Sequence, residues 1–189
     1  MNLIFATNNE HKLQEVQAII GTSFQLKSLN DIGCMDDIPE TGSTFKDNAS
    51  QKSNYIYKKY NLSCFADDSG LEIEALNMEP GVYSAHYSGE RDSEKNLQLV
   101  LENLKNESKR NARFKTVISL IIEGKEWFFE GTVEGKITLE KSGSEGFGYD
   151  PIFQPHGYGI TFADMSQLEK NKISHRAKAM ESLLAFLKQ

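Results

Sequence analysis

The sequence has little of three things that would each indicate a particular class of protein: cysteine, positive charge and long apolar runs. Its two cysteines, Cys34 and Cys64, show neither CxxC spacing nor the histidine spacing of a metal site. Two such cysteines build no disulfide framework, so we expect reduced thiols in a cytoplasmic protein. No signal-peptide pattern opens the chain, which agrees with that location.

The apolar runs and the charge balance argue against two kinds of partner. The longest apolar run, Val117 to Ile122, is far shorter than the ~20 residues of a membrane-spanning helix and predicts a buried strand. The net charge is -6, and no basic stripe runs along the chain. We therefore expect neither a membrane nor a nucleic acid as a partner. The 39% apolar content is ordinary for a globular chain, and we expect residues 1–189 to form one domain.

What the sequence does contain is a pair of adjacent acids, Asp67 and Asp68, followed by Ser69 and Gly70. They come at the end of a short apolar strand pattern. Adjacent carboxylates repel each other unless a cation, a proton or water relieves them, and the glycine lets the backbone approach a ligand. A solvated Asx turn explains this motif when it is taken alone. A divalent-cation site is the alternative, and it needs support from other segments.

A second polar segment, Thr7-Asn8-Asn9, separates an apolar run from a helical pattern whose first turn contains Lys12. A strand, a polar turn and a helix start together direct backbone N–H groups and the positive end of the helix dipole at an anion. The segment lacks the glycines of a P-loop, and Asn8 or Asn9 can simply cap the helix. Phosphate binding and capping therefore both stay open.

Glu40 and Lys52 flank the start of a helix predicted over residues 44–60. Thr44 can cap that helix, which accounts for it without any chemistry. Lys52 follows Phe45 by seven residues and lies on the same apolar face, so its ammonium group is expected at the edge of a buried stripe. From there it reaches either water or a ligand.

The last polar segments lie near the C-terminus. Phe147 stands between two glycines, a setting in which aromatic rings are commonly exposed and stack on planar ligands. Asp150 precedes a proline, which holds it extended and is expected to present its carboxylate outward. His175 and Arg176 begin a final helix, and a solvated arginine at a helix start is the simpler alternative for this pair.

Together these segments resemble the family of inosine triphosphate pyrophosphatases, which act on non-standard purine nucleoside triphosphates. The resemblance covers the whole chain, and two departures are visible: His86 stands where bacterial members usually carry arginine, and Asp164 stands for the more usual glutamate. The matching pieces are Phe5 to Asn9 with Lys12, Glu40 to Gly42 with Phe45, Asn48, Ala49 and Lys52, Ala66 to Leu71, Pro80 to Ala85, Phe147 to Phe153, and Glu169 to Arg176.

The resemblance implies a homodimeric enzyme that hydrolyses ITP, dITP and XTP to the monophosphate and pyrophosphate through Mg²⁺-assisted attack of water on the α-phosphate. It implies Asp68 as the general base. The implied metal ligands are Glu40, Asp67 and Asp68. The base is implied to stack on Phe147, with Lys170, His175 and Arg176 addressing it and Asp150 accepting from a ring N–H. Thr7, Asn8, Asn9, Lys12 and Lys52 are implied to hold the phosphates, and Ser69, Gly148 and Tyr149 complete the implied substrate-binding residues.

Donors and acceptors explain how such a site selects a base. Hypoxanthine and xanthine present a keto oxygen at C6 and a protonated N1, whereas adenine presents an amino group at C6 and no proton on N1. Lysine and arginine donors at C6 with a carboxylate at N1 therefore leave adenine with unpaired polar groups, which costs affinity. Guanine shares the keto edge, and the sequence assigns no residue to its rejection.

The alternation of strand and helix patterns predicts an α/β fold, with an elongated mixed central sheet flanked by helices and two lobes with an active-site cleft between them. Strands are expected at 63–66 and 71–76, and a hairpin at 113–122 and 126–139 around Gly124. A helix is expected from Asp92 or Ser93. The alternative to an enzyme is a nucleotide-binding sensor without turnover, against which the intact acidic pair argues.

Overall fold

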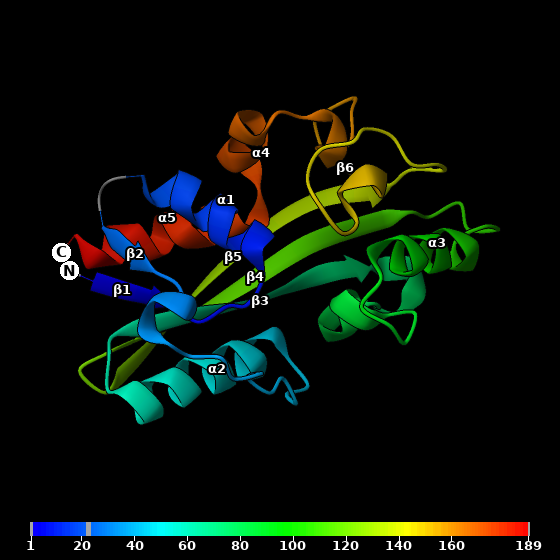
Figure 1. Ribbon diagram of the computed structural model, residues 1–189. Helices are drawn as coiled ribbons and strands as arrows, with labels where there is room; N and C mark the ends of the chain where they lie inside the picture. The colour runs from blue at the N-terminus through cyan, green and yellow to red at the C-terminus, as the bar shows by residue number, and fades with distance from the viewer. Residues whose placement is uncertain (1, 22–23, 189) are drawn as a thin grey trace. The chain divides into compact units, whose positions relative to one another are not determined.

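The structure, a computed structural model, describes residues 2–21 and 24–188, and its elements alternate between strands and helices (Figure 1). The strands are β1 (Asn2–Phe5), β2 (Gln25–Lys27), β3 (Cys64–Ile73), β4 (Asn111–Ile122), β5 (Lys125–Ile137) and β6 (Phe153–Pro155). The α-helices are α1 (Glu10–Ile20), α2 (Phe45–Tyr60), α3 (Ser93–Asn103), α4 (Gln167–Ile173) and α5 (His175–Leu187). No helix among the described residues is both long enough and apolar enough to cross a membrane.

The strands form one six-stranded sheet in the order β2-β1-β3-β4-β5-β6. β1 pairs in parallel with β2 and β3, whereas β5 and β6 are antiparallel, so the sheet is mixed, as predicted. The predicted hairpin is β4 and β5. Its turn residues Glu123 and Gly124 have φ values of 50° and 77°, the left-handed backbone that two-residue hairpin turns require and that glycine adopts without strain.

The chain forms two compact units. Unit 1 comprises Met1–Asp68, Thr116–Gly131 and Arg176–Gln189, and unit 2 comprises Ser69–Lys115 and Thr132–His175. Strands β3, β4 and β5 each contribute residues to both units. The active-site cleft expected between two lobes stays a prediction.

In unit 1, helices cover both faces of the sheet. Neighbouring residues of a strand point to opposite faces, and the two hydrophobic clusters of this unit follow that alternation. Phe5 and Phe65 pack with residues of α1 and α5, and their rings stack with centroids 4.6 Å apart. Cys64 and Ala66 pack on the other face with Ile56 of α2. Burial raises the pKa of the Cys64 thiol to about 12, so this thiol stays protonated at neutral pH.

Unit 2 has its own core, in which α3 packs against the second part of β3 and an aromatic group. α3 begins where predicted, because the Asp92 side chain accepts a hydrogen bond from the Lys95 backbone N–H at 3.0 Å. The aromatic group contains Phe114, Phe153 and Phe162, whose ring centroids lie 4.7 to 6.1 Å apart.

The main departure from the predicted fold concerns β3. It is one continuous strand, Cys64–Ile73, instead of two strands separated by an acidic turn. Asp67 and Asp68 lie inside this strand and are buried. Side-chain partners compensate their charge, so the chain does not need to turn them toward water. Those partners come from distant parts of the chain, which a strand pattern does not reveal.

Candidate active site

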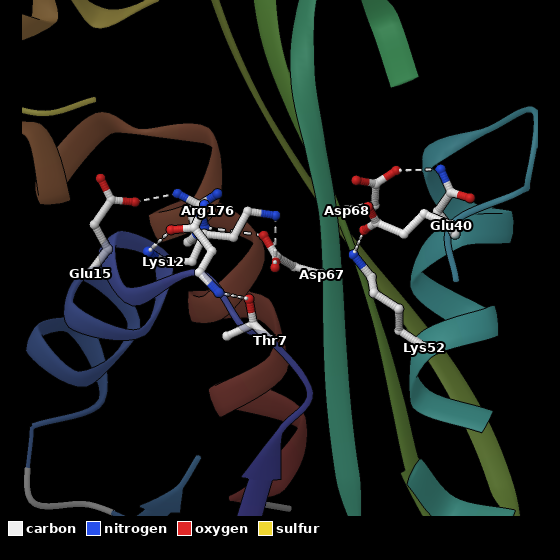
Figure 2. Close-up of polar contacts among 10 residues, drawn as sticks. Thr7, Lys12, Glu15, Glu40, Lys52, Asp67, Asp68 and Arg176 are labelled. Carbon is white, nitrogen blue, oxygen red and sulfur yellow. Dashed lines mark hydrogen bonds and ion pairs between the residues drawn. The ribbon is translucent and has the colours of Figure 1, made fainter. Parts of the chain in front are cut away.

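The two adjacent acids point to opposite faces of β3, a consequence of strand alternation (Figure 2). Asp67 is 1% exposed and points toward α1 and α5, where it meets Lys12 and Arg176. Asp68 is 7% exposed and points toward α2. The solvated Asx turn is therefore wrong. The two carboxylates therefore lie on opposite faces of the strand, and their predicted role as metal ligands stays a prediction.

On the α1 and α5 face, four buried or nearly buried charges form a chain of contacts. Lys12 Nζ donates to Asp67 Oδ1 at 3.2 Å, and Arg176 Nε donates to Asp67 Oδ2 at 3.2 Å. Arg176 Nη1 also forms an ion pair with Glu15, which is 4% exposed. Arg176 itself is 1% exposed, so the solvated helix-start alternative is wrong for this residue. Two cations face two carboxylates, and the charges balance.

These contacts fix the protonation state of Asp67. Burial opposes its ionised form, but Lys12, Arg176 and Lys52 outweigh burial and hold the pKa of the Asp67 carboxyl well below its usual range. Burial opposes the charge on Arg176 too, and Glu15 and Asp67 overcome it, so the Arg176 pKa is raised. Asp67 therefore stays ionised and pairs with Lys12 and Arg176, and it is poorly suited to accept a proton.

Asp68 has the opposite character. Its Oδ2 accepts a hydrogen bond from Asn48 Nδ2 at 2.9 Å, and Lys52 forms an ion pair with Glu40 on the same side of β3 (Figure 2). Burial raises the pKa of the Asp68 carboxyl above its ordinary value, although Lys52 and Lys12 work in the other direction. A buried carboxyl with a raised pKa beside lysines has the character of a general base.

The turn between β1 and α1 is organised by its own side chains. The Asn9 side chain accepts from the Lys12 backbone N–H at 3.1 Å and caps α1, and Thr7 Oγ1 accepts from the Asn9 N–H at 3.1 Å. Asn8 Nδ2 donates to the Asp36 carbonyl at 3.2 Å. The capping interpretation is confirmed for Asn9, while phosphate binding by this turn stays a prediction.

Unit 2 brings three of the predicted base-binding residues together. Asp150 Oδ2 accepts from Lys170 Nζ at 2.7 Å and from the Phe147 N–H at 2.9 Å. The Lys170 ammonium also lies 5.1 Å from the centroid of the Phe147 ring. Asp150 is 2% exposed, so its predicted outward direction is wrong, because Lys170 holds it inside. His175 stacks on Phe114 with a centroid separation of 4.7 Å.

Three further predicted residues, Ser69, Gly148 and Tyr149, are neighbours in sequence of Asp68 and Phe147. The Tyr149 hydroxyl donates to the Ser84 carbonyl at 2.8 Å, and Gly148 has a φ of 63°, which favours glycine. Ser69 follows Asp68 in β3 and is half-buried. His86 is exposed, and its ring meets Tyr83 edge-on at 5.8 Å.

The predicted residues thus divide between the two units, and one of them changes groups. Arg176 was expected with the base-binding residues of unit 2, but it belongs to unit 1 and contacts Asp67. The unit 1 residues are Thr7, Asn8, Asn9, Lys12, Glu40, Lys52, Asp67, Asp68 and Arg176, and the unit 2 residues are Ser69, Phe147, Gly148, Tyr149, Asp150, Lys170 and His175.

Sequence reasoning gave no role to two buried polar residues, Glu15 and Asn48, which are 4% and 3% exposed. A weak signal existed for each of them. Glu15 follows Lys12 by three residues on a short helix, and Asn48 precedes Lys52 by one helical turn. Within the described residues, no three His, Cys, Asp or Glu side chains are grouped so as to hold a metal ion by themselves.

Comparison with known proteins places the whole chain among close relatives. The sequence profile of the Ham1 family matches residues 3–186. A dITP/XTP pyrophosphatase of Flavobacterium psychrophilum is 51% identical over 189 residues, covering 100% of both chains, and one of Porphyromonas gingivalis is 49% identical over 187 residues, covering 98% of this chain and 96% of the relative. A solved HAM1 protein from Coxiella burnetii has a TM-score of 0.91 at 38% identity, covering 100% of this chain and 98% of that one.

Proposed function

This chain belongs to the Ham1 family, and from that premise we propose that it hydrolyses non-standard purine nucleoside triphosphates, removing them from the nucleotide pool. The proposed substrates are dITP, XTP and ITP, and the products are the nucleoside monophosphate and pyrophosphate. Two relatives named dITP/XTP pyrophosphatase, which match 100% and 98% of the chain, support the substrate class. The family resemblance predicted from the motifs is confirmed.

The observation that carries the proposed mechanism is the contrast between Asp67 and Asp68. Asp67 is bonded to two cationic side chains. Asp68 instead accepts from an amide, lies beside Glu40 and Lys52, and has a carboxyl pKa that burial raises. We assign Asp68 as the general base. It accepts a proton from water while the water oxygen bonds to the α-phosphorus, and the bond from that phosphorus to the bridging oxygen of the β-phosphate breaks. Pyrophosphate leaves with that oxygen.

The charged side chains of unit 1 supply electrostatic stabilisation for this displacement. In this proposal Lys12 and Lys52 neutralise charge on the triphosphate, together with the N-terminal end of α1, and their ion pairs with Asp67 and Glu40 beside β3 support it. In unit 2, Lys170 and Asp150 present a donor and an acceptor beside the Phe147 ring, a combination that suits the keto and N1–H groups of hypoxanthine and xanthine.

The proposed cofactor is Mg²⁺, and the donor set of unit 1 fits it. This ion usually binds one or two protein carboxylates and completes its coordination with water and substrate phosphates. Glu40 and Asp68 lie on the same side of β3, so they are the two carboxylates that would hold it, while Asp67 is occupied by Lys12 and Arg176 (Figure 2). When bound, the ion supplies charge neutralisation and lowers the pKa of coordinated water.

The remaining parts of the proposal are a cytoplasmic location and a homodimer. Two buried thiols without a disulfide support the first, and the family resemblance alone supports the second. A sensor that binds nucleotides without turning them over is the competing function. The arrangement of Asp68, Glu40 and Lys52 on one side of β3 argues for turnover, because binding alone does not need a base there.

Product analysis tests this function. With Mg²⁺ present, dITP and XTP should give dIMP or XMP and one equivalent of pyrophosphate, and dATP should react far more slowly. Anion-exchange chromatography of the nucleotides with a separate pyrophosphate assay distinguishes the outcomes. Release of orthophosphate and a nucleoside diphosphate as first products would contradict the proposed reaction, and tight binding of dITP without turnover would favour the sensor.

A further inference from the structure

The buried amide of Asn48 bridges two segments of the chain, the one that carries Glu40 and strand β3, which carries Asp68. Asn48 Oδ1 accepts a hydrogen bond from the Gly42 backbone N–H at 2.7 Å, and Asn48 Nδ2 donates to Asp68 Oδ2 at 2.9 Å. Gly42 lies two residues after Glu40. Asn48 is 3% exposed, so its amide competes little with water for these partners, and both hydrogen bonds help to determine the local geometry.

The direction of the Asn48 amide is dictated by its partners. A backbone N–H can only donate, so the amide oxygen must face Gly42. The NH₂ group is then the only part of this side chain left to face Asp68. The reversed amide would place two donors against each other at Gly42 and two acceptors against each other at Asp68. The Gly42 segment therefore determines that Asp68 receives a donor at Oδ2.

The segment that orients Asn48 is itself tightly held. A Cβ added to Gly42 would lie 2.5 Å from the Cβ of Asp47 and 2.8 Å from Asn48 Oδ1, so no side chain fits there without displacing the first turn of α2. A second amide of α2 holds the preceding residue: Gln51 Oε1 accepts from the Thr41 N–H at 2.9 Å, and Gln51 Nε2 donates to Thr41 Oγ1 at 3.1 Å.

Three residues of α2 thus each hold one residue of the segment from Glu40 to Gly42. Lys52 pairs with Glu40, Gln51 holds Thr41, and Asn48 holds Gly42. Of the two amides, Asn48 is the one that donates a hydrogen bond to Asp68. A carboxylate in a strand can rotate about its terminal torsion, which is broad and has few intrinsic preferences. The hydrogen bond from Asn48 restricts that rotation.

We propose that Asn48 is a positioning residue that sets the orientation of the Asp68 carboxylate relative to the Glu40 segment. The inference rests on the proposed function, because that function makes Asp68 the group that accepts a proton from water. Asn48 need not touch the substrate. Its loss lets Asp68 rotate away from the attacking water, and small misplacements of a catalytic group cost about 10²-fold in rate.

Gln51 offers a matched control on the same helix. Asn48→Ala and Gln51→Ala each remove an amide that holds the segment from Glu40 to Gly42, but only Asn48→Ala also removes the donor to Asp68. We expect Asn48→Ala to lower kcat by about 10-fold to 10²-fold with a KM within about 3-fold of wild type, and Gln51→Ala to keep kcat within about 3-fold. Steady-state kinetics with dITP at saturating Mg²⁺, alongside thermal unfolding, provides these values.

A second variant covers the case in which Asn48→Ala does not fold. Asn48→Asp keeps the volume and the acceptor for the Gly42 N–H, but it has no N–H to offer Asp68 and sets a second carboxyl against it, so a loss of kcat at least as large is expected. Wild-type kcat in either Asn48 variant would overturn the inference. So would an equal loss in Gln51→Ala, because the effect would then come from the segment alone. An inactive wild-type protein would overturn the proposed function itself, and this inference with it.

Discussion

Replacing Asp68 with asparagine is expected to lower kcat for dITP by about 10²-fold or more, the usual scale for loss of a general base. The variant keeps the shape of the side chain, and its amide oxygen can still accept the hydrogen bond from Asn48. The fold should therefore remain, and thermal unfolding of the variant should resemble that of the wild type. Turnover measured at saturating Mg²⁺ isolates the chemical step from metal affinity.

Asp67→Asn is the natural comparison, because the two acids are adjacent and differ in their partners. It weakens the charge balance around Lys12 and Arg176, so it should lower stability more than Asp68→Asn does. If Asp68→Asn retained wild-type turnover, Asp68 would not be the base. The role of Asp67 would then have to be reconsidered, despite its depressed pKa.

The second large effect is expected from Arg176→Ala, which should lower the free energy of unfolding by about 3–5 kcal/mol. The substitution leaves Asp67 and Glu15 buried without their shared cation. Urea denaturation measures the loss, and Lys178→Ala, an exposed substitution on the same helix, should change stability by about 0.5 kcal/mol or less. Adding Glu15→Gln to Arg176→Ala should restore part of the stability, because one uncompensated charge disappears. No recovery in the double variant would contradict this charge account.

The pH dependence of that loss provides an independent check. The Asp67 pKa is depressed in the folded protein, so its ion pairs contribute stability above the unfolded pKa, about 3.9, and this contribution fades as the pH falls through the folded value. The stability difference between wild type and Arg176→Ala should therefore be largest near neutral pH and shrink in acid. A difference that stays constant from pH 7 to pH 3 would show that lost packing, and not lost charge pairing, causes it.

The same residue tests the predicted contact with the base. If Arg176 donates to the keto oxygen as well as to Asp67, Arg176→Lys should narrow the ratio of kcat/KM between ITP and ATP. An unchanged ratio together with a loss of stability would mean that Arg176 is a structural cation of unit 1. Selection of the base would then fall to Lys170 and Asp150.

Local sequence patterns predicted the local structure well. The capping side chains of α1 and α2 and the hairpin of β4 and β5 depend on residues within a few positions of one another, so a local pattern contains them. The motifs also predicted one functional group of the acidic pair, Glu40 and Lys52, and in the structure Asp68, Glu40 and Lys52 lie on the same side of β3 while Asp67 lies on the other. The capping and hairpin predictions use residues that are close in sequence, whereas the functional grouping comes from the resemblance to a family over the whole chain.

The partners of the acidic pair were not predictable in the same way. Arg176 meets Glu15 across 161 positions of sequence and Asp67 across 109, and nothing local indicates which buried acid a distant arginine will choose. The face on which each acid lies follows from strand alternation, but only once Asp67 and Asp68 are known to be inside β3. The continuity of β3 in turn depends on those distant partners.

The most direct test of the central claim is to follow the oxygen of the attacking water. Hydrolysis of dITP in H₂¹⁸O should place one ¹⁸O atom in dIMP and none in pyrophosphate, because water directed by Asp68 is proposed to attack the α-phosphorus. Mass spectrometry of both products after a single turnover gives the answer. Label found in pyrophosphate would mean attack at the β-phosphorus, and it would contradict the account.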